Sequence, residues 1–123
     1  LKFSTLKQNL ESGGHKKIAV AIGQTIKFID INDIVLIKAD GAYSEIILND
    51  ESKFLISKNL KHFEDLLSFS EAFIRVHKSY LINAQYVSEY IKSDGGYLLL
   101  NGKHQVSITH DKVERLLQLI SSR

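Results

Sequence analysis

The residues best suited to chemistry lie in one stretch, Phe73–Asn83, which reads FIRVHKSYLIN and interleaves apolar residues with Arg75, His77 and Lys78. Arginine and lysine are the side chains that meet phosphates and guanine edges, and serine and asparagine add adaptable hydrogen bonds. Taken alone, Arg75 and His77 favour a structural interpretation, in which the arginine pairs with a nearby acid and the imidazole is half-buried. The stretch as a whole indicates a polar binding surface.

The sequence gives little support to catalysis or metal binding. No two of the five histidines have the i, i+4 spacing that places two metal ligands on one helix face; they lie at positions 15, 62, 77, 104 and 110. His77 and Ser79 could form a triad with Asp40 or Asp94, but chance produces such a trio in most chains of this composition. There is no HExxH, glycine-rich phosphate loop, GxSxG motif or cysteine. We therefore expect no enzyme, no metal and no other cofactor.

The elements that must position this stretch are mostly short strands. From Lys17 onward, apolar residues alternate with polar ones between turns rich in Gly, Asn and Asp. Ile34–Lys38 begins with four apolar residues, which predicts a strand buried on both faces. Asn101-Gly102 is the strongest hairpin signal, because both central residues of a type I′ turn need positive φ. The expected strands are 17–22, 25–29, 34–38, 43–48, 52–56, 73–76, 80–83 (the most ambiguous), 86–92, 97–100 and 104–109.

Two segments have helical spacing. The first follows Ser57 or Asn59 as N-cap and places apolar residues on one face, at Leu60, Phe63, Leu66 and Leu67. The second is C-terminal, with apolar positions 113, 116, 117 and 120, and with Asp111 and Glu114 spaced as a capping box. The sequence thus predicts a mostly β fold of about ten short strands in antiparallel sheets, with one short internal helix and a C-terminal helix. The expected core is Ile18, Val20, Phe28, Ile34, Leu36, Ile46, Leu48, Phe63, Ile74, Val76, Leu81, Leu98, Val113 and Leu117.

Length and composition fit one soluble domain. The chain has 123 residues, 44% hydrophobic and 24% charged, which suffices for a core without disulfides or metal. No apolar run approaches the roughly 18 residues of a membrane span and no signal peptide opens the chain, so we expect a cytoplasmic protein without membrane contact. Residues 1–16 are predicted to be a linker and 17–123 the folded domain. The absent initiator Met suggests a piece of a longer protein or a processed chain.

The net charge of +2 is unevenly distributed along the chain. Residues 1–29 carry +4, residues 30–71 carry −5, and residues 72–123 carry +3. If the fold brings the outer thirds together, one face becomes locally basic. The alternative is a solvated surface of mixed sign.

The stretch 73–83 resembles the signature of LytTR-type domains, the DNA-binding output domains of bacterial response regulators of the LytR/AlgR class. Residues 33–43 (DIVLIKADGAY) resemble the family's strand-and-turn motif, and residues 57–64 (SKNLKHFE) resemble its internal helix. Residues 106–113 resemble its final strand entering the last helix. The similarity covers nearly all of residues 17–120, and four motifs in the same order make it specific.

The resemblance implies a fold that reads double-stranded DNA with loops and strand ends in successive major grooves. It further implies dimers on paired direct repeats and an upstream receiver domain missing from this chain. Three places would contact DNA: the strand start after Ala39, the HKS stretch and the entry to the last helix. Lys78 would face the DNA, with Arg75 and His77 flanking or bracing it. The expected contacts are Tyr43, Ser44, Arg75, His77, Lys78, Ser79, His110 and Lys112.

The third place departs from the family pattern. Family members commonly carry Arg or Lys directly after the position of Thr109, whereas His110 and Asp111 follow it here. An acid that faces phosphate would repel it, so either Lys112 takes over the contact or Asp111 caps the helix and points away. We favour capping, because Glu114 lies three residues further on, as in a capping box.

The leading hypothesis is a sequence-specific DNA-binding output domain of a two-component response regulator that controls transcription. The alternative is a non-enzymatic protein- or ligand-binding β module whose contacts are exposed tyrosines: Tyr43, Tyr86, Tyr90 and Tyr97. An RNA-binding barrel is a further option, but aromatic residues do not cluster on one strand pair as base-stacking platforms do.

Overall fold

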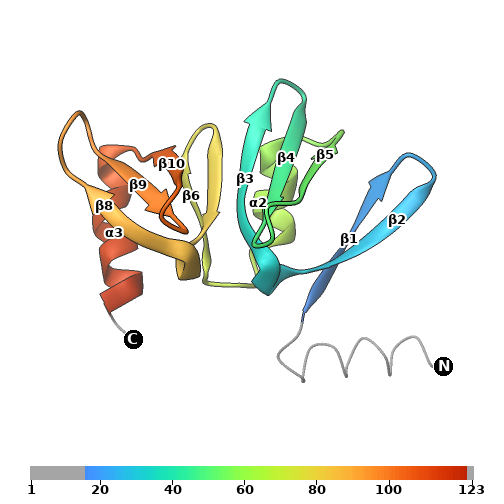
Figure 1. Cartoon of the computed structure of the whole chain (residues 1–123), viewed down its shortest axis with the longest axis horizontal. Helices are drawn as coiled ribbons and strands as arrows, with labels where there is room; N and C mark the ends of the chain where they lie inside the picture. The colour runs from blue at the N-terminus through green and yellow to red at the C-terminus, as the bar shows by residue number, and fades with distance from the viewer. Residues whose placement is uncertain (1–15, 122–123) are drawn as a thin grey trace.

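The computed structural model describes residues 16–121 and confirms the predicted fold class. Its ten strands form antiparallel sheets of two, three and five strands, accompanied by two α-helices and two 3-10 turns (Figure 1). The elements are β1 (Lys17–Ile22), β2 (Thr25–Asp30), η1 (Ile31–Asp33), β3 (Ile34–Asp40), β4 (Tyr43–Leu48), β5 (Lys53–Ile56), α2 (Leu60–Leu66), β6 (Phe73–His77), β7 (Tyr80–Asn83), η2 (Ala84–Tyr86), β8 (Val87–Ile91), β9 (Tyr97–Leu100), β10 (His104–Ser107) and α3 (His110–Ser121).

The five-stranded sheet, in the order β5-β4-β3-β7-β6, is the centre of the molecule. As predicted, the first four residues of β3 are all buried. A β-bulge between Ile34 and Leu36 divides them between the two faces, with Ile34 and Ile37 on one side and Val35 and Leu36 on the other. The central sheet therefore has a hydrophobic core on each face.

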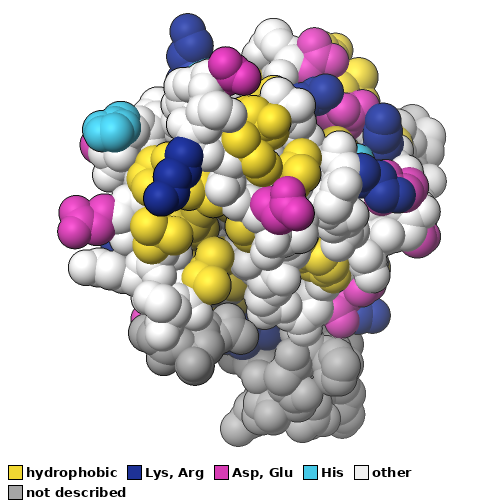
Figure 2. Space-filling model, turned by 60° about the vertical axis from the view of Figure 1, so that its left-hand side comes forward, with side chains coloured by type: hydrophobic (Ala, Val, Ile, Leu, Met, Phe, Trp, Pro, Cys, Tyr) yellow, Lys and Arg dark blue, Asp and Glu magenta, His cyan; other side chains and the backbone are white. Residues whose placement is uncertain are grey.

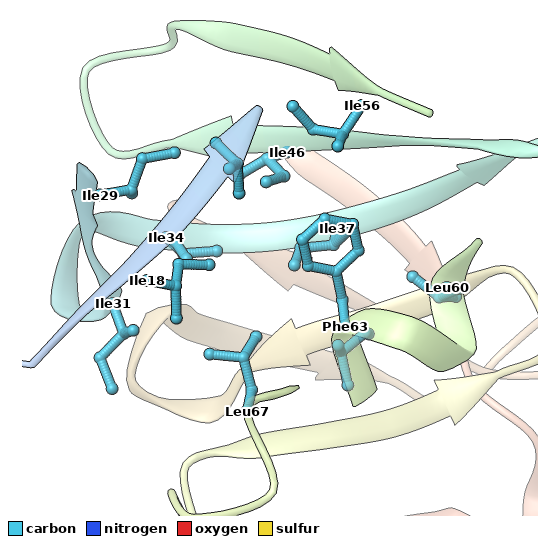
Figure 3. Close-up of a cluster of buried hydrophobic side chains, with 12 residues drawn as sticks. Ile18, Ile29, Ile31, Ile34, Ile37, Ile46, Ile56, Leu60, Phe63 and Leu67 are labelled. Atoms are coloured by element: carbon cyan, nitrogen blue, oxygen red, sulfur yellow. The ribbon is translucent and has the colours of Figure 1, made fainter. Parts of the chain in front are cut away.

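The two cores recruit different parts of the chain. On one face, α2 contributes Leu60 and Phe63, and the β1–β2 hairpin contributes Ile18 and Ile29 (Figure 3). On the other face, the β8–β9–β10 sheet and Leu116 of α3 cover the central strands. Neither described helix has the length and apolar character that a membrane crossing requires.

Four residues expected in the core are not fully buried. Phe28 is 66% exposed, because the register pairs Ile18 with Ile29 on the inner face of the β1–β2 hairpin and leaves Phe28 on the outer face. On α3, Leu116 is the residue that enters the core, and Leu117, 100° further around the helix, is 49% exposed. Leu48 and Val113 pack against the two cores while remaining partly accessible.

The N-cap prediction is confirmed for α2 and wrong for α3. Asn59 caps α2 as predicted, and its side-chain Oδ1 accepts the His62 N–H at 2.9 Å. The prediction that Asp111 caps α3 is wrong, because the helix begins at His110 and Asp111 lies within its first turn. The Lys112 N–H donates to the Thr109 carbonyl at 3.0 Å, so Thr109 immediately precedes the helix.

The predicted linker, residues 1–16, lies outside the described residues except for Lys16. The Lys16 carbonyl accepts the Ile31 N–H at 2.9 Å, and its ammonium lies 4.7 Å from the centre of the Phe69 ring. These contacts attach Lys16 to the folded domain.

Asn83 is a polar side chain buried where β7 leaves the central sheet. It is 1% exposed; its Nδ2 donates to the Ile34 carbonyl at 3.0 Å, and its Oδ1 accepts the Gln85 N–H at 3.0 Å. Replacing it with alanine leaves both backbone groups without these partners. We expect Asn83→Ala to lower the free energy of unfolding by about 2 kcal/mol, measured by urea denaturation, because orphaned buried groups each cost roughly 1–3 kcal/mol. A loss no greater than that of the exposed Gln85→Ala would contradict this.

Candidate nucleic-acid interface

The three predicted contact segments lie together at one end of the central sheet. The Ala39 N–H donates to the Ser79 carbonyl at 2.9 Å, which joins the β3–β4 and β6–β7 turns. The Thr109 N–H donates to the Val76 carbonyl at 2.8 Å, which joins the start of α3 to the end of β6. In Figure 1 both turns and the start of α3 lie at the top. We call residues 40–43, 77–80 and 109–112 the loop edge.

Arg75, on β6, fixes the backbone of the β6–β7 turn through hydrogen bonds, a role called bracing below. Its Nε donates to the His77 carbonyl at 3.0 Å, and one terminal nitrogen donates to the Lys78 carbonyl at 2.7 Å. The other terminal nitrogen forms an ion pair with Glu64 of α2 at 2.8 Å. Since all three guanidinium nitrogens are engaged, the bracing role is the one this geometry supports, and it ties the turn to α2.

His77 and Ser79 shape the same turn. The Nδ1 atom of His77 accepts the Ser79 N–H at 3.1 Å, so in the neutral ring the proton is assigned to Nε2. The His77 ring packs against Tyr80, with 5.6 Å between the ring centres. Both His77 and Ser79 are half-buried. His77 therefore holds the turn with one nitrogen and keeps its Nε2–H as a donor.

The side chains at the tips of the two turns are exposed. Lys78 is exposed between the two half-buried residues of its turn. Tyr43 begins β4 opposite Asp40 and is 46% exposed. A cation and an aromatic hydroxyl thus extend from a braced backbone.

Ser44 does not belong to this surface. It is fully buried, and its Oγ donates to the Lys58 carbonyl at 2.8 Å. Because side chains alternate along a strand, the residue after exposed Tyr43 points inward. The prediction that Ser44 contacts DNA is corrected on this ground.

The same hydrogen bond reveals a residue that sequence reasoning missed. Lys58 lies in the connection from β5 to α2, and the pairing of Ser44 with Ile56 brings this connection to the loop edge. Its side chain is exposed. Lys58 belongs to the motif at residues 57–64, but only the register of β4 with β5 places it at the loop edge.

The start of α3 adds groups of both signs. His110 and Asp111 are exposed and Lys112 is half-buried. The free N–H groups of a first helical turn favour an anion, whereas the Asp111 carboxylate opposes one. Lys112 is therefore the cation of this segment that suits a phosphate.

The clear pKa shifts occur away from the loop edge. Partial desolvation raises the pKa of Glu51, but hydrogen bonds and charge from His104 and Lys103 outweigh it and hold the pKa below its usual value. Burial raises the pKa of Tyr86, and the charges of Asp33 and Asp30 add to this. The Tyr86 hydroxyl donates to the Asn32 carbonyl. These groups connect the β8–β9–β10 sheet to the rest of the fold.

The face drawn in Figure 2 does not carry one continuous basic field. Figure 2 shows Lys and Arg side chains scattered among acidic and apolar ones on the face that includes the left-hand side of Figure 1. Within residues 16–121, no three His, Asp or Glu side chains converge as metal ligands would. The alternative hypothesis needs exposed tyrosines. Tyr86 and Tyr90 pack against a core and Tyr97 is half-buried. Of the four tyrosines, only Tyr43 is therefore exposed as that hypothesis requires.

Comparisons with known proteins show the family and the fold of the chain. The family described as LytTr DNA-binding domain matches residues 24–121. The sensory transduction protein LytT of Bacillus subtilis (strain 168) is 30% identical over 118 residues, which is 92% of this chain and 48% of that protein. The heme-containing CO-sensing transcriptional regulator RcoM 2 of Paraburkholderia xenovorans (strain LB400) is 30% identical over 107 residues, which is 85% of this chain and 39% of that protein.

The chain thus spans less than half the length of these curated relatives. Among solved structures, the LytTr DNA-binding domain of a methyl-accepting/DNA response regulator from Bacillus cereus superposes with a TM-score of 0.68 at 15% identity. The superposition covers 85% of this chain and 95% of that one. This similarity establishes a shared fold.

Proposed function

Because the chain belongs to the LytTR family of DNA-binding domains, which serve transcriptional regulators, we propose that it binds duplex DNA through the loop edge. The observation that carries this proposal is the brace beneath the β6–β7 turn. Arg75 fixes the carbonyls of His77 and Lys78, and exposed Lys78 extends from the turn. A fixed backbone reduces the conformational entropy that Lys78 loses on binding.

Neither helix is placed to read a groove as a recognition helix does. α2 has only seven residues and buries Leu60 and Phe63 against the central sheet. α3 buries Leu116 and offers only its first turn at the loop edge. The turns are therefore the elements that enter the DNA, and we propose that the β3–β4 and β6–β7 turns enter the major groove.

The side chains at the loop edge and Lys58 can each be assigned a role in DNA binding from their donor groups. Lys78 and Lys58 neutralise phosphates or reach a guanine edge, and Lys112 contacts a phosphate beside the start of α3. The Nε2–H of His77, the Tyr43 hydroxyl and the exposed His110 supply hydrogen bonds. The low net charge of +2 implies few phosphate contacts and a modest affinity for a single copy. We therefore propose that two copies bind paired direct repeats.

The regulatory context is also a proposal. One relative is named a sensory transduction protein and another a CO-sensing regulator, and each is more than twice as long as its matched part. We propose that this domain is the output part of a cytoplasmic two-component response regulator, with its receiver domain outside this chain. The test is whether a phosphorylated receiver, joined upstream, raises DNA affinity. Unchanged affinity would contradict the response-regulator role and leave DNA binding itself intact.

Removing the Lys78 ammonium should weaken binding to every duplex. We expect Lys78→Ala to raise the Kd about tenfold, the value of one charge-assisted contact of ~1.5 kcal/mol. The slope of log K against log salt should fall in magnitude by about 0.9, one phosphate's worth. Fluorescence anisotropy on a duplex enriched by the chain from a randomised library measures both quantities.

The matched control is Lys53→Ala. Lys53 is exposed and begins β5 at the end of the central sheet opposite the loop edge, since Ile56 is the β5 residue that pairs with Ser44. Its removal should leave the salt slope unchanged. Equal losses for Lys78→Ala and Lys53→Ala would mean that the lysines act only through net charge and would contradict the assignment of the loop edge.

A further inference from the structure

A cleft of about 340 Å³ opens beside the loop edge, between the end of α2, strand β6 and the first turns of α3. β6 is the last strand of the central sheet, so no neighbouring strand covers this side. The charged residues that line the cleft are Glu64, Glu71, Arg75, Lys112 and Arg115. The cleft therefore shares Arg75 and Lys112 with the predicted contacts and adds Arg115, which no motif indicated.

Two cations in this cleft remain available to a ligand. Arg75 and Glu64 neutralise each other in their 2.8 Å ion pair. Lys112 and Arg115 lie three residues apart on α3 and so share one face of the helix. Among residues 16–121, no ion pair or hydrogen bond of either side chain is present. The surface of the cleft contributed by α3 is thus positive and unneutralised.

Arg115 lies behind Lys112 on α3, as seen from the loop edge. The helix runs away from the loop edge (Figure 1), and Arg115 lies about 4.5 Å further along its axis than Lys112 at 1.5 Å per residue. Helical side chains tilt back toward the N-terminus of their helix, which favours reach from Arg115 toward Lys112, and both side chains line the same cleft. Arg115 also borders Glu71 and the following turn of α3.

We infer that Arg115 binds a DNA phosphate that flanks the base pairs contacted by the loop edge, next to the phosphate held by Lys112. This inference rests on the proposed function. Glu71, an exposed carboxylate in the same cleft, opposes the phosphate electrostatically. The cleft therefore contains one group whose removal weakens DNA binding and one whose removal strengthens it.

The experiment uses the whole chain and two probes. The long probe is the library-selected duplex with about ten additional base pairs, one helical turn, on each side, and the short probe lacks these flanks. We expect Arg115→Ala to raise the Kd for the long probe about fivefold and to reduce the salt slope by about 0.9. Glu71→Gln should lower the Kd about twofold, because it removes a like charge within the ~10 Å Debye length of the phosphate.

On the short probe, Arg115→Ala should bind as the unsubstituted chain does. An unchanged Kd and salt slope for Arg115→Ala on the long probe would overturn the inference, and so would equal losses on both probes. Arg115 is exposed, and an unchanged thermal midpoint verifies that the variant folds. If Arg115→Ala leaves the Kd for DNA unchanged and Lys78→Ala raises it, only this inference is refuted. If neither variant changes the Kd, the proposed function is refuted as well.

Discussion

Replacing Arg75 with alanine is expected to weaken DNA binding by tenfold to a hundredfold, although its guanidinium need not touch the DNA. The substitution removes the donors to the His77 and Lys78 carbonyls and the ion pair with Glu64. Hydrogen bonds to charged groups contribute roughly 1.5–3 kcal/mol each, so the β6–β7 turn should lose its fixed conformation. Urea denaturation should show a loss of about 2 kcal/mol, and anisotropy should show the higher Kd.

A second variant separates a brace from a direct contact. Glu64→Gln removes the charge that pairs with Arg75 and leaves the two hydrogen bonds from Arg75 to the turn intact. If Arg75 is a brace, Glu64→Gln should leave the slope of log K against log salt unchanged and should tighten binding about twofold at most, as expected for Glu71→Gln. If Arg75 contacts DNA directly, Glu64→Gln should free its guanidinium for a phosphate and increase the magnitude of the slope by about 0.9, which would contradict the bracing role.

Replacing Phe63 with alanine should produce the largest loss of stability in the chain. Phe63 is fully buried, and it joins α2 to the core beneath the central sheet (Figure 3). Truncation of a buried phenylalanine costs about 3–5 kcal/mol, because apolar burial is lost and a cavity remains. A helix as short as α2 has little stability of its own, so its packing decides whether it forms.

Chemical denaturation measures this loss as a shift in midpoint at unchanged m-value. The matched control is Leu66→Ala on the same helix, where the side chain is 36% exposed and a loss of about 1 kcal/mol is expected. Equal losses at the two positions would contradict the assignment of Phe63 to the core.

Local signals in the sequence predicted much of the fold. The apolar run at the start of β3 indicated a strand covered on both faces, and the structure confirms it. Asn101 and Gly102 adopt the positive φ angles, 56° and 70°, that a type I′ turn requires. Each of these features depends on the chemistry of a few adjacent residues, which is why the sequence alone sufficed.

Long-range pairing could not be predicted in the same way. The exposure of Phe28 follows from the register of β1 with β2, which a one-residue shift would reverse. The division into three sheets depends on which strands pair, and alternation within a strand does not reveal its neighbours. The hydrogen bonds from Thr109 to the Val76 carbonyl, which place the start of α3 against β6, span 33 residues and have no local signal.

In the candidate site, too, the features that depend on local sequence were predicted and those that depend on long-range pairing were not. The stretch 73–83 was recognised as the polar segment, and its residues 77–80 lie at the loop edge. The role of Arg75 was left open between brace and contact, and its partners Glu64, His77 and Lys78 lie on two separate elements. Ser44 was misplaced, because alternation along β4 turns it inward from exposed Tyr43. Lys58 was missed, because only the β4–β5 register places it at the loop edge.

The most direct test of DNA binding through the loop edge is a salt series on two duplexes of equal composition. One duplex is enriched by the chain from a randomised library, and the other has the same bases in scrambled order. We predict tighter binding to the enriched duplex at every salt concentration, an affinity that falls with salt, and a slope about 0.9 smaller for Lys78→Ala. Equal binding to both duplexes, or a slope that Lys78→Ala leaves unchanged, would contradict sequence reading by the loop edge.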